Sequence, residues 1–112
     1  MNNKQIITDE DVEKAVDFLI NTAEKAAKYK AERIYLTEYR KSLKALLMKD
    51  NLDLPISAQE REAYASPVYI SHLDALRSAI EKDEKQRFLR IAAEAKIEAW
   101  RSMSANIRSI KI

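Results

Sequence analysis

The sequence contains no glycine, and its two prolines, Pro55 and Pro67, lie close together near the middle. Tight β-hairpin turns usually need a residue with positive φ, which is most often glycine, so a fold of several strands is disfavoured. Alanine, leucine, lysine, glutamate and arginine are abundant instead, and these residues lose little side-chain freedom in a helix. The sequence therefore predicts an all-α protein.

A long stretch without a helix breaker precedes the prolines. Thr8, followed by three acidic residues, is typical of a helix start. Its hydroxyl can accept a hydrogen bond from a free backbone amide of the first turn, and acidic side chains there interact favourably with the helix dipole. Nothing interrupts the pattern until Pro55, which disfavours helical geometry in the residue before it. We expect a helix over about 9–49.

Two further start signals follow. Ser57, with Glu60 three positions later, predicts a capped short helix over about 58–65. Ser66 before Pro67 predicts a third start, with proline at the first helical position, and this helix is expected over 67–108.

Charge alternates along the chain: residues 1–24 and 50–86 are mainly acidic, whereas 25–49 and 87–112 are mainly basic. Antiparallel pairing of the two long helices places an acidic block beside a basic block in both halves. Each exposed ion pair contributes less than ~1 kcal/mol, so the blocks set alignment more than stability. The expected architecture is a single helical domain over 1–112, a long antiparallel hairpin with a short helix in the connector.

The apolar residues change sides along the first predicted helix. At about 100° per residue, Val12, Val16 and Leu19 share one face, whereas Leu36 and Leu43 lie on roughly the opposite face. We therefore expect the direction of burial to switch. Either a continuous helix packs on different partners along its length, or the chain bends or breaks near 28–33.

The second long helix shows the same behaviour. Tyr69 and Leu76 belong to one apolar stripe, a polar stretch follows, and the stripe that contains Phe88 and Ile91 is rotated. A lone hairpin would leave much of this surface exposed, which is typical of a protein contact. We expect the hairpin to assemble into a bundle as a homo-oligomer and to bind a protein partner, and the alternative is that bends let it close on itself as a four-helix fold. The candidate oligomer or partner interface is formed by Leu36, Tyr39, Leu43, Leu47, Phe88, Ile91 and Trp100.

The residues offer little for catalysis. Without glycine there is no phosphate-binding loop or dinucleotide fingerprint, and without cysteine there is no thiolate. His72 is the only histidine, and Glu94 and Glu98 lie among basic residues that favour solvated ion pairs. We expect a protein that is not an enzyme, with no metal site, no cofactor and no evident small-molecule substrate.

A basic stripe lies on the second half of the first predicted helix, with Tyr29 and Tyr35 beside it. Such a stripe can follow several phosphates, and tyrosines can stack on unpaired bases. A second basic cluster, which includes Lys96 and Lys111, lies near the C-terminus. The candidate nucleic-acid-binding residues are Lys30, Arg33, Arg40, Lys41, Lys44, Arg101 and Arg108. The alternative is that these cations form solvated faces of a charge-matched helix pair.

Three stretches, EYRKSLKALLMK (38–49), AQEREAYASPVYISHLDALR (58–77) and AEAKIEAWRSMSANIR (93–108), resemble a group of small all-helical proteins of tailed phages and prophages. The most particular features are Tyr-Ala-x-Pro at 64–67, His-Leu-x-x-Leu-Arg at 72–77 and Ile-Glu-x-Trp-Arg at 97–101. The first 25 residues show no such likeness. The resemblance implies an accessory role near recombination or replication and carries over no functional residue.

Three functional hypotheses follow. The first is a non-enzymatic phage-type accessory protein that oligomerises and supports DNA recombination or replication through a basic helix face. The second is an inhibitor or adaptor that docks on a host or phage protein, and the third is a structural virion component. No apolar run approaches the roughly 20 residues of a membrane span, and the N-terminal stretch turns acidic where a signal peptide has its apolar core. We expect a cytoplasmic protein of the bacterial host cell, without membrane contact.

Overall fold

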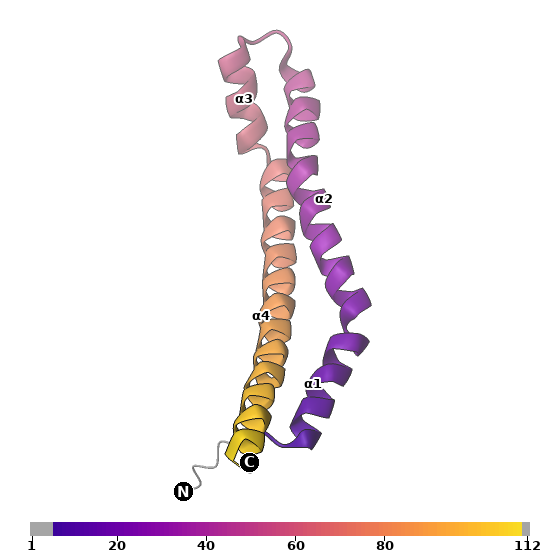
Figure 1. The fold of residues 1–112 in the computed structure, drawn as a ribbon. Helices are drawn as coiled ribbons and strands as arrows, with labels where there is room; N and C mark the ends of the chain where they lie inside the picture. Colours follow the sequence, from indigo (N-terminus) through magenta and orange to yellow (C-terminus); the bar gives the residue numbers. More distant parts are fainter. Residues whose placement is uncertain (1–5, 111–112) are drawn as a thin grey trace, which may run out of the picture. The chain divides into compact units, whose positions relative to one another are not determined.

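A computed structural model describes residues 6–110 of the chain, and these residues form helices joined by short turns (Figure 1). The elements are α1 (Asp9–Asn21), α2 (Ala23–Met48), the one-turn 3₁₀ helix η1 (Lys49–Asn51), α3 (Ile56–Ala65) and α4 (Pro67–Ile110). No strand occurs between residues 6 and 110, so the all-α prediction is confirmed. In this same range, no helix combines the length and the apolar character needed to cross a membrane.

The chain divides into two compact units, of which the first joins two segments distant in sequence and the second is one continuous segment. The first, called the α1 unit, contains residues up to Ala26 together with those from Lys85 onward. The second, called the α3 unit, contains Ala27–Glu84 and so holds most of α2, all of α3 and the first part of α4.

The α3 unit is an antiparallel hairpin. Arg33 Nη1 donates to Asp83 Oδ2 at 3.2 Å and to Glu84 Oε2 at 2.7 Å, whereas His72 Nε2 lies 2.7 Å from the carbonyl oxygen of Leu36. A lower residue number in α2 thus pairs with a higher one in α4, which confirms the predicted hairpin in this unit. The same ion pairs join the predicted basic block 25–49 to the acidic block 50–86.

Two of the predicted helix starts are confirmed in detail. Thr8 Oγ1 accepts from the Asp11 amide at 3.1 Å, and Asp11 Oδ2 accepts from the Thr8 amide at 3.0 Å. The bond from the Thr8 backbone, followed by that with its side chain, lowers the pKa of Asp11. Ser66 Oγ accepts from the Val68 amide at 3.2 Å, which caps the start of α4.

The predicted cap at Ser57 is wrong. α3 begins at Ile56, and Pro55 precedes it without any side-chain capping bond. Proline has a φ already suited to this position, so the chain enters the helix before Ser57 is reached. Gln59, which belongs to the predicted capping sequence, instead donates from Nε2 to the Leu54 carbonyl at 2.8 Å.

The long N-terminal helix is interrupted at Thr22, and the predicted break near 28–33 is wrong because α2 is continuous there. Thr22 Oγ1 donates to the carbonyl oxygen of Phe18 at 2.6 Å, and the Thr22 amide donates to the same oxygen at 3.0 Å. A threonine hydroxyl that bonds back one turn competes with the helical hydrogen bonds and bends helices. The helix is thus interrupted at Thr22 without glycine or proline. The back-bond alone does not account for the break, because Thr37 Oγ1 makes the same bond to the Arg33 carbonyl at 2.7 Å inside the continuous α2.

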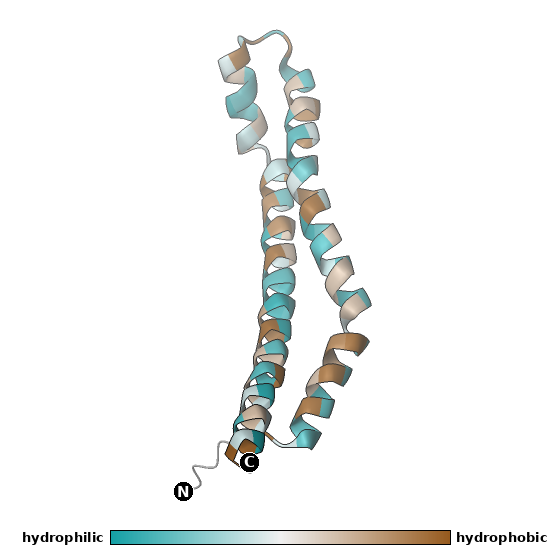
Figure 2. Ribbon diagram, in the orientation of Figure 1, coloured by the Kyte–Doolittle hydropathy of each residue, from teal (hydrophilic) through white to brown (hydrophobic). Residues whose placement is uncertain are grey.

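Burial along α4 does not follow the apolar stripes. Positions in a row with alternating spacings of three and four are buried or half-buried: Tyr69, His72, Leu76, Ala79 and Asp83 in the α3 unit, then Gln86, Arg90, Ala93, Ile97 and Trp100 in the α1 unit. This is the spacing of helices that pack as a coiled coil. For α4, the expected switch in the direction of burial is therefore wrong. The row continues through the hydrophilic band in the middle of α4 (Figure 2), where polar residues occupy it.

Candidate nucleic-acid interface

A surface groove in the α3 unit brings basic and aromatic side chains together. Its volume is about 670 Å³, and its lining residues are Arg40, Lys41, Lys44, Ala45 and Met48 from α2, Tyr64 from α3 and Tyr69 from α4. The α2 residues recur at intervals of about one turn, so they share one face of that helix. We call this feature the basic groove.

Lys44 is the best-anchored cation of the basic groove. Its Nζ donates to Glu60 Oε2 at 2.6 Å and lies 4.9 Å from the centroid of the Tyr64 ring. The bond with Glu60, followed by the contact with Tyr64, raises the pKa of Lys44, so the ammonium stays charged. Its charge is nevertheless balanced locally by the Glu60 carboxylate.

The other two cations of the basic groove are less constrained. Arg40 is exposed and forms no ion pair among residues 6–110. Lys41 Nζ lies 3.5 Å from Glu38 Oε1, with side-chain exposures of 74% and 66%. A pair this exposed contributes little, because solvent screens it and both side chains lose freedom. Arg40 and Lys41 are thus the cations best placed to bind an anion.

Two tyrosines form the aromatic wall of the groove. Their ring centroids lie 5.2 Å apart with an interplanar angle of 76°, an edge-to-face arrangement. Tyr69 is buried, with 7% exposure, whereas Tyr64 is 47% exposed. Tyr69 therefore supports Tyr64, whose side chain is exposed although the Lys44 ammonium lies over its ring.

The predicted basic stripe is only partly assembled in this groove. Arg40, Lys41 and Lys44 line it, but Arg33 is engaged by Asp83 and Glu84. The bond with Glu84, then that with Asp83, raises the pKa of Arg33. Lys30 is exposed on α2 and is not among the lining residues.

The tyrosines that the sequence singled out lie elsewhere. Tyr29 and Tyr35 line a second groove of the α3 unit, with a volume of about 760 Å³ and mostly small or apolar neighbours. Tyr35 stacks on Tyr39 with ring centroids 6.0 Å apart. Sequence reasoning missed Tyr64 and Tyr69, because only the packing of α3 and α4 brings them to the basic residues of α2.

The C-terminal basic cluster lies in the α1 unit. Arg101 and Arg108 line a shallow groove of about 420 Å³ beside Trp100. Arg101 Nη1 donates to Glu98 Oε2 at 2.6 Å within α4, so this cation already has an anionic partner. Lys111 lies outside the described residues.

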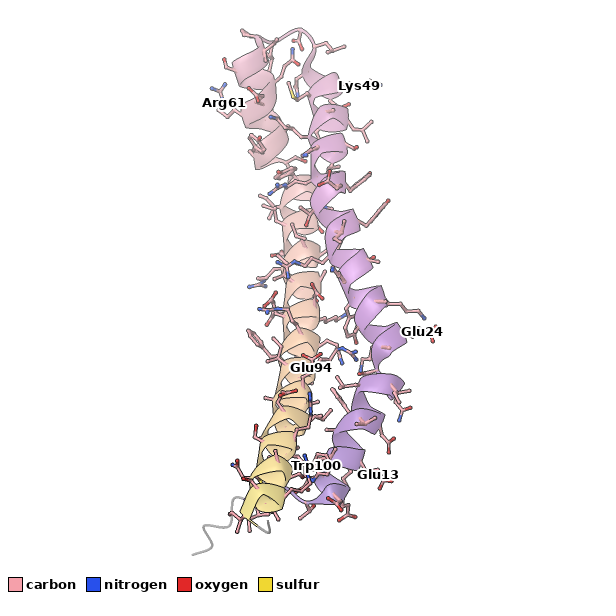
Figure 3. All side chains as sticks on the ribbon, viewed as in Figure 1. Glu13, Glu24, Lys49, Arg61, Glu94 and Trp100 are labelled. Atoms are coloured by element: carbon pink, nitrogen blue, oxygen red, sulfur yellow. The ribbon has the colours of Figure 1, made fainter. Side chains whose placement is uncertain are left out.

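Most of the predicted interface residues pack within their own unit. Leu43 is buried, and Leu36, Tyr39, Leu47 and Trp100 are half-buried. Trp100 donates from Nε1 to Asp9 Oδ1 at 2.9 Å, on the side of α4 that faces α1 (Figure 3). Of the predicted interface, only Phe88 and Ile91 are exposed, at 59% and 45%.

These two residues belong to an apolar face on the opposite side of α4 from the buried row. Exposed alanines continue it, and we call the set the outer face: Phe88, Ile91, Ala92, Ala95 and Ala99. The guanidinium carbon of Arg87 lies 4.7 Å from the centroid of the Phe88 ring, so the Arg87 side chain covers part of the outer face at its N-terminal end.

Among residues 6–110, no group of three or more histidine, aspartate or glutamate side chains is arranged to hold a metal ion. No family model, no curated protein and no solved structure matches this chain. The basic groove and the outer face are the two surface features described above that are suited to binding a partner.

Proposed function

We propose that this chain is a non-enzymatic helical accessory protein that binds single-stranded DNA in the basic groove. The observation that carries the proposal is that Arg40 and Lys41 of α2 line the same groove as the exposed Tyr64 of α3. Phosphates would pair with the two cations, and an unpaired base would stack on the tyrosine.

The geometry favours a single strand over a duplex. Stacking on Tyr64 requires a base whose face is free, and the bases of a duplex already stack on one another. The formal net charge of the chain is only +2, so no broad positive field holds a duplex by its backbone. Binding should be modest and salt-dependent, with a slope of roughly −0.7 per phosphate contact.

The resemblance of residues 38–108 to small phage and prophage proteins supports the same proposal. Recombination and replication both expose single strands, and a small protein that coats or delivers such strands needs no catalytic residue. Within this proposal, the chain acts in the cytoplasm of a bacterial host.

Reversing the two most exposed cations of the groove, Arg40→Glu with Lys41→Glu, should weaken binding of a fluorescent oligothymidine by more than about 10-fold. The reason is that two attractive phosphate contacts become repulsive, while the buried Leu43 of α2 and the buried row of α4 are untouched. Fluorescence anisotropy at low salt measures the change. The matched control is Lys30→Glu with Arg77→Glu, which alters net charge equally on exposed residues outside the groove.

Equal weakening by both double variants would mean that the oligonucleotide senses only net charge. Absence of any binding by the native protein at low salt would end the nucleic-acid proposal.

A second candidate function, docking on a protein, rests on the outer face of α4. Phe88→Glu places a charge at its most exposed aromatic residue and should remove a contact made there. Sedimentation velocity of the native protein and of this variant reports self-association. Recovery of one stoichiometric protein partner after nuclease treatment, lost in the variant, indicates an adaptor. A monomer that retains no partner contradicts both uses of this face.

A further inference from the structure

Two acidic residues contact cations of the basic groove: the exposed Glu38, beside Lys41, and Glu60, beside Lys44. The Glu60 carboxylate accepts the shortest ion-pair bond of the groove, 2.6 Å from Lys44 Nζ, although Glu60 itself is not one of the lining residues. The two side chains are 40% and 27% exposed, so neither is locked by burial. A carboxylate at this place repels any phosphate that enters the groove and occupies the cation that would otherwise bind it.

Lys44 also covers the aromatic wall. Because its ammonium lies 4.9 Å from the centre of the Tyr64 ring, the bond to Glu60 holds a cation over the surface on which a base would stack. Breaking the bond between Lys44 and Glu60 would therefore free the Lys44 ammonium to bind a phosphate and would change the access of a base to the Tyr64 ring. The three side chains form a linked set in which Glu60 favours the unoccupied groove.

We propose that Glu60 is an internal competitor for the phosphate of a bound strand, and that strand binding requires Lys44 to exchange its Glu60 partner for a phosphate. This inference rests on the proposed function of the basic groove, since it describes how that same site is restrained. Binding then depends on a balance between two anions for one ammonium, which keeps the affinity of the native groove low.

Removing the competing charge with Glu60→Gln should tighten oligothymidine binding by about 3- to 10-fold at low salt and steepen the salt slope by roughly 0.7, the value for one added phosphate contact. The matched control is Glu62→Gln on the same helix, which alters net charge equally. Glu62 is 4.0 Å from Arg61, is 52% exposed and does not line the groove. Anisotropy titrations at several salt concentrations give both quantities.

A double variant identifies Lys44 as the cation that is released. Glu60→Gln combined with Lys44→Gln should bind no more tightly than the native protein, because the freed ammonium is absent. Thermal unfolding followed by circular dichroism shows whether each variant is folded at the temperature of the titration.

The outcomes separate this inference from the proposed function. Equal affinities of the Glu60 and Glu62 variants overturn the internal competitor, even where Arg40→Glu with Lys41→Glu still abolishes binding. A gain in Glu60→Gln that persists without Lys44 also overturns it. If Glu60→Gln binds the oligothymidine and the native protein does not, Glu60 is an internal competitor, but the native protein does not have the proposed function. If neither protein binds, the internal competitor and the proposed function are both refuted.

Discussion

Replacing Leu76 by alanine should lower the free energy of unfolding by about 2–4 kcal/mol. Leu76 is 7% exposed and lies in the buried row of α4 within the α3 unit. The core among residues 6–110 is thin: besides alanines, its buried apolar residues are Leu43, Tyr69 and Leu76, and no large side chain is fully buried. A cavity at Leu76 therefore removes a large share of the apolar burial that holds this unit together.

Leu73→Ala is the matched control for this prediction. Leu73 lies on the same helix, about one turn from Leu76, and the same atoms are removed, but its exposure is 40%. Its loss should lower the free energy of unfolding by less than about 1 kcal/mol. Urea unfolding followed by circular dichroism measures both variants. Equal losses would show that α4 buries a different side from the one described.

The comparison of Leu73 with Leu76 also shows how far the sequence could predict burial. Both residues belong to one apolar stripe, because a period of 3.6 residues defines a broad face and cannot say which edge meets a partner. The row that is buried continues through Asp83, Gln86 and Arg90, which a search for apolar residues rejects. These polar residues can be assigned to the row only after the facing helix is known.

Gln86 is a buried polar residue that a search for apolar residues does not select. It is 5% exposed, and its Nε2 has no hydrogen-bond partner among residues 6–110. Burying an amide donor without a partner is unfavourable, so sequence reasoning expects such a residue outside the core. Its position in the row follows from spacing, three residues after Asp83 and four before Arg90, and not from its side chain.

Helix boundaries were predictable where one local contact decides them. The caps at Thr8 and Ser66 involve residues two or three positions apart, so the sequence contains the whole interaction. The interruption at Thr22 was not predicted, since threonine is common inside helices and bends them only in some settings. There the setting includes a side chain from α4.

The candidate site was predictable in the same partial way. Arg40, Lys41 and Lys44 lie on one helix, so their spacing alone places them together. Tyr64 and Glu60 reach the groove from α3, and no periodicity in the sequence links them to α2. Arg33 was wrongly expected in the site, because nothing in the neighbouring sequence predicts its ion pairs with Asp83 and Glu84 of α4.

Replacing Arg90 by methionine should lower the free energy of unfolding by about 1–3 kcal/mol, because it removes the donor that bonds to the Leu19 carbonyl of α1 and to the Thr22 hydroxyl. Arg90 Nη1 donates to the Leu19 carbonyl at 2.9 Å and to Thr22 Oγ1 at 2.8 Å. Leu19 lies in the last turn of α1, where carbonyls lose their helical partners and where a cation is favoured by the helix dipole. Methionine keeps an apolar stem of similar length, so the loss reports mainly on the donors.

Arg101→Met is the control, since Arg101 is 67% exposed and, within the described residues 6–110, bonds only to Glu98 of its own helix. Its replacement should change the free energy of unfolding by no more than about 0.5 kcal/mol. Thr22→Val in both the native and the Arg90→Met background completes a double-mutant cycle, and a coupling energy above about 0.5 kcal/mol is expected for groups in direct contact. Independent effects of the two substitutions would contradict this role, because Arg90 would then stabilise α4 without acting on the break at Thr22.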